Sequence, residues 1–149
     1  MYSDAFCNGK ALETAFLETK RFVVIYDISP LLPGNSLVVP RRHIPYITDL
    51  TNDEILELKV LLRRLIPRLL KIYHADSYNI AVNAGKHAAM ISNHLHFHIV
   101  PRNAKDIYQG KTFFPYYDSL QLGRYKYIKN VDNEVAKLRR VFKYKPHKK

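Results

Sequence analysis

The sequence has little of what marks secreted or membrane proteins. Its 149 residues include one cysteine, Cys7, so no disulfide can form within the chain. No stretch approaches the ~18 consecutive apolar residues of a membrane span. The N-terminal stretch lacks the charged start and apolar run of a signal peptide. We therefore expect a soluble, cytoplasmic protein with no membrane partner.

Internal repeats and low-complexity linkers are also absent, which excludes solenoids and linker-joined modules. What is present is 47% apolar and 12% aromatic residues, enough to bury a core and to exclude wholesale disorder. A chain of this length supports one domain with one core.

Positive charge is concentrated in the last third of the chain. The net charge is +11, but residues 1–101 carry 11 basic and 9 acidic residues, whereas residues 102–149 carry 13 and 4. We expect a core over residues 1–102 and a basic aromatic extension over residues 103–149, which packs on the same domain.

Aromatic and basic residues interleave in this extension. They are Tyr108, Phe113, Phe114, Tyr116, Tyr117, Tyr125 and Tyr127 with Lys111, Arg124, Lys126 and Lys129. This pattern suits base stacking and phosphate contact on a nucleic acid. It equally suits a segment that packs back onto its own domain, because exposing so many aromatic rings is costly.

The order of apolar segments predicts strands on both sides of one long helix, which favours an α+β fold with an antiparallel sheet of about five strands. We expect one strand ending near Ile28, with a partner strand before it, and a turn at Pro33-Gly34. The other expected strands are Ser36–Pro40, Ser77–Val82 and His94–Pro101, and a short basic helix is expected over Asn133–Phe142.

The long helix should begin at Thr51, which forms a capping box with Glu54. Its expected apolar face is Ile55, Leu58, Leu62, Leu65, Ile66 and Leu69, and its expected solvated face is Lys59, Arg63, Arg64 and Arg68. Pro67 removes one backbone hydrogen bond, so we expect a kink or an early end there.

Three histidines, His94, His96 and His98, alternate with apolar residues. On a strand this spacing puts the imidazoles on one face and Leu95, Phe97 and Ile99 on the other, in the core. The imidazole face then belongs to a cleft.

Three explanations of this face remain open. Three alternating histidines do not easily meet at one metal ion, because the outer Cα atoms lie ~13 Å apart; two of them with a remote ligand can. The histidines can instead be satisfied or solvated groups without chemistry. Alternatively, a neutral imidazole attacks phosphorus at pH 7 while its neighbours contact phosphate oxygens. His96, flanked on both sides, is then the nucleophile.

The run from His94 to Val100, followed by Pro101-Arg102, resembles the signature of the histidine-triad (HIT) superfamily of nucleotide hydrolases and transferases. Residues 26–43 resemble the strand-turn-strand that carries the family's ribose-binding acid, and Asn83-Ala-Gly85 resembles its Asn-x-Gly. The resemblance covers residues 6–102 and implies a HIT-like fold.

The resemblance also implies roles for individual residues. His96 would form a nucleotidyl-histidine intermediate at the α-phosphorus, while His94 and His98 orient it and contact phosphate. Asp27 would accept hydrogen bonds from ribose hydroxyls, and Asn83 would contact the phosphate or leaving group. The residues that match the family's apolar slot for a purine base are Phe6, Ile25, Ile28 and Leu37, each of which would also suit an ordinary core position.

Three departures from the family pattern alter these expectations. Ala89-Met90-Ile91-Ser92 replaces Gly-Gln-Ser/Thr-Val, which implies weaker or altered phosphate binding. Gly34-Asn35 replaces Gly-His and removes a fourth imidazole. The zinc-type Cys-x-x-Cys survives only as Asp4-Ala-Phe-Cys7, so we expect no metal site.

Two functions are therefore open. The first is a hydrolase that releases a nucleoside monophosphate, AMP above all, from dinucleoside polyphosphates or nucleoside phosphoramidates. It would require no cofactor, although Mg²⁺ can arrive with a polyphosphate. The second is a weakly catalytic nucleotide-binding protein whose basic tail binds nucleic acid or another acidic partner. The resemblance also implies a homodimer.

Overall fold

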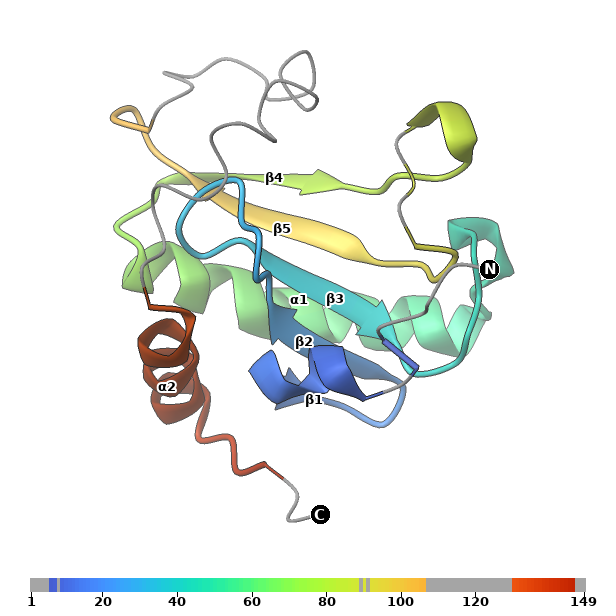
Figure 1. The fold of residues 1–149 in the computed structure, drawn as a ribbon, viewed down its shortest axis with the longest axis horizontal. Coiled ribbons are helices and arrows are strands. Elements are labelled where there is room, and N and C mark those ends of the chain that lie inside the picture. Colours follow the sequence, from blue (N-terminus) through green and yellow to red (C-terminus); the bar gives the residue numbers. More distant parts are fainter. Residues whose placement is uncertain (1–5, 8, 89, 91, 107–129, 147–149) are drawn as a thin grey trace.

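A computed structural model describes residues 6–7, 9–88, 90, 92–106 and 130–146 of the chain (Figure 1). Within these residues lies a five-stranded sheet in the order β1-β2-β3-β5-β4, in which every neighbouring pair is antiparallel. The strands are β1 (Ala15–Glu18), β2 (Phe22–Tyr26), β3 (Ser36–Pro40), β4 (Ser77–Ala81) and β5 (Phe97–Arg102). With its two α-helices, the structure confirms the expected α+β fold.

Helix α1 (Asn52–Ile72) covers one face of the sheet (Figure 1). The capping box forms as expected: the Thr51 hydroxyl accepts from the Glu54 N–H, and the Glu54 carboxylate accepts from the Thr51 N–H. Of the two outcomes expected at Pro67, a kink or an early end, the early end is wrong, because the helix continues to Ile72. Tertiary packing of Leu65 and Leu69 on both sides of the proline outweighs the one lost hydrogen bond.

The apolar face of α1 agrees with the expected one at Leu58, Leu65 and Leu69 and differs from it at two positions. Leu61 is buried at 1% exposure, whereas Ile55 is 49% exposed. Ile55 fits the 3.6-residue period as well as Leu61 does, so periodicity alone cannot separate the two.

Helix α2 (Val131–Phe142) belongs to the same core as the sheet and α1. Val135, Leu138 and Phe142 are buried there, and the ring of Phe142 lies 5.3 Å from that of Phe16 on β1. The Arg139 guanidinium donates to the carbonyl oxygens of Glu13 and Ala15. The expected short basic helix is thus present, and its apolar side completes the main core.

Short 3-10 helices are η1 (Lys10–Thr14), η2 (Ile47–Asp49) and η3 (Lys86–Ala88). Among the described residues, no helix combines the length and apolar character needed to cross a bilayer. The interleaved aromatic and basic residues at positions 108–129 lie outside the described residues, so their expected roles stay predictions.

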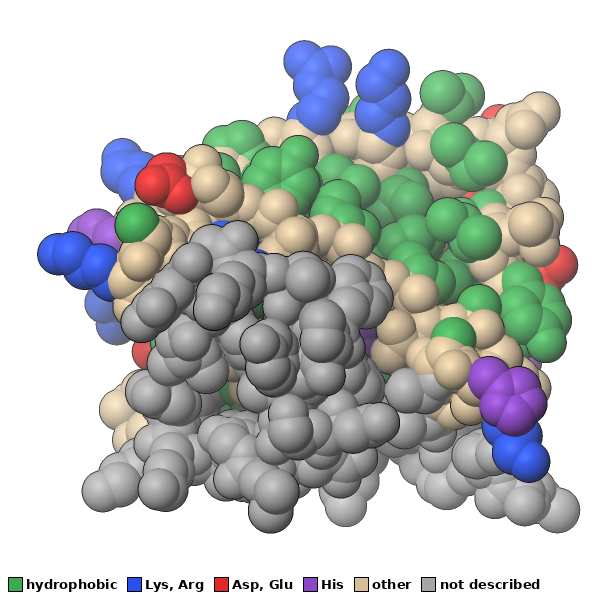
Figure 2. All heavy atoms as spheres, turned by 90° about the horizontal axis from the view of Figure 1, so that it is seen from above, with side chains coloured by type: hydrophobic (Ala, Val, Ile, Leu, Met, Phe, Trp, Pro, Cys, Tyr) green, Lys and Arg blue, Asp and Glu red, His purple; other side chains and the backbone are tan. Residues whose placement is uncertain are grey.

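Strand β4 forms one edge of the sheet. Its apolar side chains Tyr78 and Ile80 are 47% and 41% exposed. Figure 2 views the molecule from the side on which β4 lies in Figure 1, and hydrophobic side chains gather there in one continuous patch.

Candidate active site

The three histidines lie on the sheet face opposite α1. Leu95, Phe97 and Ile99 point into the core under α1, as the alternation predicted. The regular strand begins at Phe97 rather than at His94, because Leu95 donates its N–H to the Ile44 carbonyl outside the β3–β5 pairing. The imidazoles are nevertheless all buried, at 2%, 4% and 7% exposure for His94, His96 and His98.

A backbone hydrogen bond orients the middle histidine. His96 Nδ1 lies 2.9 Å from the carbonyl oxygen of His94. A carbonyl oxygen only accepts, so Nδ1 carries the proton and donates. In the neutral ring Nε2 then carries the lone pair, which is the atom a phosphorus nucleophile needs.

Asp27 lies directly after β2 and is held by two donors. Its Oδ1 accepts from the Ser29 N–H and its Oδ2 from the Asn35 side-chain amide, both at 2.9 Å. His98 Nδ1 lies 3.8 Å from Oδ2. Each carboxylate oxygen has two lone pairs, so this carboxylate can accept further hydroxyl groups.

Sequence reasoning noted Asn35 only as a missing imidazole. In the structure Asn35 is fully buried and holds both ends of its turn: its N–H donates to the Leu32 carbonyl, and its own carbonyl accepts from the Asp27 N–H. The sequence offered one sign of this structural role, which is the position of Asn35 directly after the turn glycine Gly34. A polar residue buried beside a tight turn generally has a hydrogen-bond partner.

Three of the four residues predicted for a base slot come together. Ile25 pairs with Leu37 across β2 and β3, and Leu37 pairs with His98 across β3 and β5. Ile25 and Leu37 belong to one buried cluster, against which Phe6 packs. The Phe6 ring lies 5.4 Å from that of His96. Ile28 is 68% exposed and belongs to none of the buried clusters.

The segment between β4 and the triad carries the remaining predicted residue. Asn83 is half-buried just after β4, and Gly85 has a φ of +89°. Ser92 lies two residues before His94, and its Oγ is buried with no hydrogen-bond partner among the described residues. Residues 89 and 91 lie outside the described residues.

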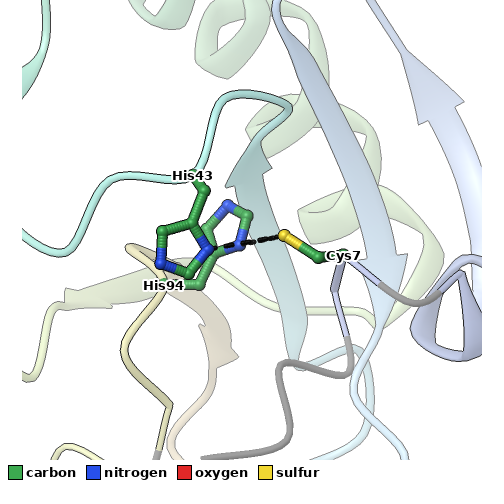
Figure 3. Close-up of side chains that lie close together, drawn as sticks. All are labelled: Cys7, His43 and His94. Atoms are coloured by element: carbon green, nitrogen blue, oxygen red, sulfur yellow. Dashed lines mark hydrogen bonds between the residues drawn. The ribbon is translucent and has the colours of Figure 1, made fainter.

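A second group of donors lies beside the triad (Figure 3). Cys7 Sγ is 3.4 Å from His43 Nδ1 and 3.6 Å from His94 Nδ1. The three ligand atoms all lie within 4.8 Å of one another. Sequence reasoning considered Cys7 only as the remnant of a Cys-x-x-Cys pair whose first cysteine is absent, and it did not single out His43, because positions 43 and 94 lie far from Cys7 in the chain.

These three side chains fit a zinc ion. Zn–S and Zn–N bonds of ~2.3 and ~2.1 Å at the tetrahedral angle place sulfur and nitrogen about 3.6 Å apart, which matches both observed separations. His94 Nε2 lies 2.8 Å from the Pro40 carbonyl oxygen, so it carries the proton and directs the Nδ1 lone pair toward Cys7. The neighbouring Arg41 and Arg42 are paired with Glu18 and Glu54, which compensates their positive charge.

A separate cavity of about 600 Å³ contains none of the predicted site residues. Its described lining is Leu32, Pro33, His74, Asp76, Asn103, Ala104, Lys105 and Asp106. The candidate site is therefore defined by the histidines and not by this cavity.

A five-stranded sheet with three alternating histidines on the face opposite its long helix is the arrangement that the resemblance to the HIT superfamily predicted. The family model described as "HIT domain" matches residues 8–105, so the chain belongs to the HIT family.

Two curated relatives illustrate how much of the chain is shared. The asymmetrical bis(5'-nucleosyl)-tetraphosphatase of Schizosaccharomyces pombe is 34% identical over 91 residues, which are 61% of this chain and 50% of that protein. The chain thus spans about half the length of that relative. An uncharacterised HIT-like protein of Saccharolobus solfataricus is 32% identical over 136 residues, which are 85% of this chain and 98% of that protein.

The fold is similarly shared with solved structures. A zinc-bound histidine triad family protein of Mycobacterium smegmatis superposes with a TM-score of 0.70 at 27% identity. The superposition covers 95% of this chain and 94% of that one.

Proposed function

We propose that this chain is a hydrolase that releases a nucleoside monophosphate, AMP above all, from dinucleoside polyphosphates or nucleoside phosphoramidates. The observation that carries the proposal is the hydrogen bond from His96 Nδ1 to the His94 carbonyl, which places the lone pair of the neutral ring on Nε2, the atom proposed to attack phosphorus. The name of the tetraphosphatase relative supports the substrate class.

The reaction proceeds in two displacements. His96 Nε2 attacks the α-phosphorus, a P–N bond forms, and the P–O or P–N bond to the leaving group breaks as that group takes up a proton. Water then attacks the same phosphorus and gives up one proton to solvent, which balances the proton that the leaving group took from solvent. The P–N bond to His96 breaks, its electron pair returns to Nε2, and the nucleoside monophosphate leaves. The His94 carbonyl stabilises the positive charge that the His96 ring carries between the two steps.

The other residues bind the nucleotide. Phe6, Ile25 and Leu37 contact the base, and Asp27 accepts hydrogen bonds from the ribose hydroxyls. His98 and Asn83 contact the phosphates, with the Ser92 hydroxyl as a further donor. His94 orients His96 through its backbone carbonyl. Its ring nitrogens Nε2 and Nδ1 contact the Pro40 carbonyl and Cys7 Sγ, so its role is to position other groups. Mg²⁺ arrives with a polyphosphate substrate and needs no site of its own on the chain.

The zinc of the Mycobacterium smegmatis structure supports a metal ion in this chain also. Cys7, His43 and His94 would hold it, which reverses the expectation of no metal site. An ion held there would fix Cys7 and the N-terminal segment to His43 and His94, so its role would be structural.

A homodimer remains part of the proposal. The exposed apolar side chains of β4, Tyr78 and Ile80, support it, since no described strand pairs with the outer side of β4 and an edge strand favours pairing with another strand. Light scattering measures the mass, and a monomer would remove this part.

The central test compares the wild type with His96→Asn on diadenosine polyphosphates and on an adenosine phosphoramidate, with AMP release followed by chromatography. Loss of the nucleophile should lower kcat by roughly 10³-fold or more. His74→Asn, a histidine outside the proposed site, is the matched control and should retain full activity. Equal rates for His96→Asn and wild type would refute the proposed nucleophile.

A further inference from the structure

The Cys7–His43–His94 cluster lies next to the proposed base slot in sequence as well as in space. Phe6 immediately precedes Cys7, and its ring lies 5.5 Å from the His94 ring and 5.4 Å from the His96 ring. One short segment thus supplies both a metal-type ligand and an aromatic contact to the nucleophile.

The two sides of this cluster differ in burial. Cys7 is exposed and Phe6 only partly buried, whereas His94 is buried at 2% exposure. An ion shared by Cys7 and His94 would therefore join an exposed segment to a fixed point of the core. Because Phe6 is the direct chain neighbour of Cys7, its ring would be fixed against His96 at the same time.

We infer that Cys7, His43 and His94 form a metal clip that sets the position of Phe6, so that one bound divalent ion raises the affinity of the site for a nucleotide. The part of this inference that concerns nucleotides rests on the proposed function. Phe6 is here a positioning residue for the base, and the ion takes no part in the displacement at phosphorus.

The expected size of the effect follows from ordering side chains before the ligand arrives. Immobilising a side chain on binding costs roughly 0.5–1.5 kcal/mol, which corresponds to an affinity gain of about 2- to 12-fold when the ion has already done it. A larger change would require direct contact between the ion and the nucleotide, so the size of the effect distinguishes positioning from direct contact.

Metal binding is tested first and without any nucleotide. The full-length protein is stripped with a chelator and titrated with Zn²⁺ or Co²⁺. We expect one ion per chain, a near-ultraviolet thiolate–Co²⁺ band and slower alkylation of Cys7 by iodoacetamide, a clean readout because the chain has one cysteine. Cys7→Ser and His43→Asn should lose all three signals, while His74→Asn should keep them. Absence of binding to the wild type would overturn the clip.

The position of residue 6 is tested next, again without nucleotide. The chain has no tryptophan, so Phe6→Trp introduces a single reporter. We expect Zn²⁺ to lower acrylamide quenching of this tryptophan by about twofold, and to have no effect in the Phe6→Trp/Cys7→Ser variant. A metal-bound protein whose tryptophan is quenched as before would overturn the inference even though the ion binds.

The final measurement is the affinity for AMP by calorimetry, with and without Zn²⁺. The wild type should bind AMP about 3- to 10-fold more tightly when loaded, whereas Phe6→Ala should load with Zn²⁺ but show the same affinity in both states. An unchanged affinity in the wild type would refute the coupling. No AMP binding in either state, with the tryptophan response intact, would refute the proposed function and leave a metal clip of the N-terminal segment.

Discussion

Gly34→Ala should destabilise the protein more than a change of one methyl group ordinarily does. Gly34 has a φ of +87°, a region that residues with a Cβ rarely adopt. A Cβ built at this position would lie 2.5, 2.7 and 2.8 Å from Cδ2, Cε2 and Cγ of Tyr73. The ring cannot easily move away, because the Tyr73 hydroxyl donates to Glu134 Oε2 at 2.6 Å and Lys137 Nζ lies 4.6 Å from the ring centroid.

Two costs add at this position. The left-handed backbone conformation costs about 1–2 kcal/mol for a residue with a Cβ. Forcing a methyl group into an occupied space costs about 1–3 kcal/mol more. The total of about 2–5 kcal/mol corresponds to a fall in Tm of roughly 6–16 °C for a chain of this size.

The assay is urea and thermal unfolding of Gly34→Ala beside Gly85→Ala. Gly85 has a similar φ of +89°, but a Cβ there meets nothing within 4 Å, so its variant bears the backbone cost alone. The difference between the two variants measures the clash with Tyr73. In a double-mutant cycle, Tyr73→Leu should recover part of the loss in Gly34→Ala. Equal destabilisation by the two glycine variants, or no recovery in the double variant, would refute the reasoning.

Two further results are expected. Hydrogen bonds from the Arg42 guanidinium lower the pKa of Glu54 to about 2, so the ionised carboxylate contributes about 1–2 kcal/mol to the free energy of unfolding above the ordinary glutamate pKa of 4.5, and this contribution is lost as the pH falls toward 2. Urea unfolding at pH 7 and pH 3 should therefore show a smaller loss of stability in Glu54→Gln than in the wild type. An equal loss in both proteins would contradict this reasoning. Ser92→Ala should raise KM for a polyphosphate roughly 3- to 10-fold. It should leave Tm unchanged, since the Ser92 Oγ has no hydrogen-bond partner among the described residues that the substitution would remove. A lower Tm at an unchanged KM would instead assign Ser92 a structural role.

Local signals in the sequence predicted most of the fold. The strand Ser36–Pro40 and the cap at Thr51 depend on short-range patterns, and the structure confirms both. The alternation at residues 94–99 correctly separated the core side from the histidine side. These features depend on the period of a strand or on one turn of a helix, which a sequence displays directly.

The features that sequence reasoning missed depend on distant parts of the chain. Periodicity could not choose between Ile55 and Leu61, because the choice depends on where the sheet lies under α1. The metal-type cluster joins Cys7 to His43 and His94, which lie 36 and 87 positions further along the chain. The remnant of the Cys-x-x-Cys motif therefore gave no sign of these two partners. Asn35 looked like a loss because its partner, Asp27, is reached only across a folded turn.

The pairing of Ile25, Leu37 and His98 across three adjacent strands fixes the distance between the proposed base slot and the proposed phosphate contact. Neighbouring strands lie about 4.8 Å apart, so the backbone positions of Ile25 and His98, two strands apart, are separated by about 10 Å. If the row binds a nucleotide as proposed, substitutions of its side chains would change the base preference without changing that length. A shift of one residue in the register between β3 and β5 would instead turn Leu37 or His98 to the other face of the sheet, and the three side chains would no longer form one row.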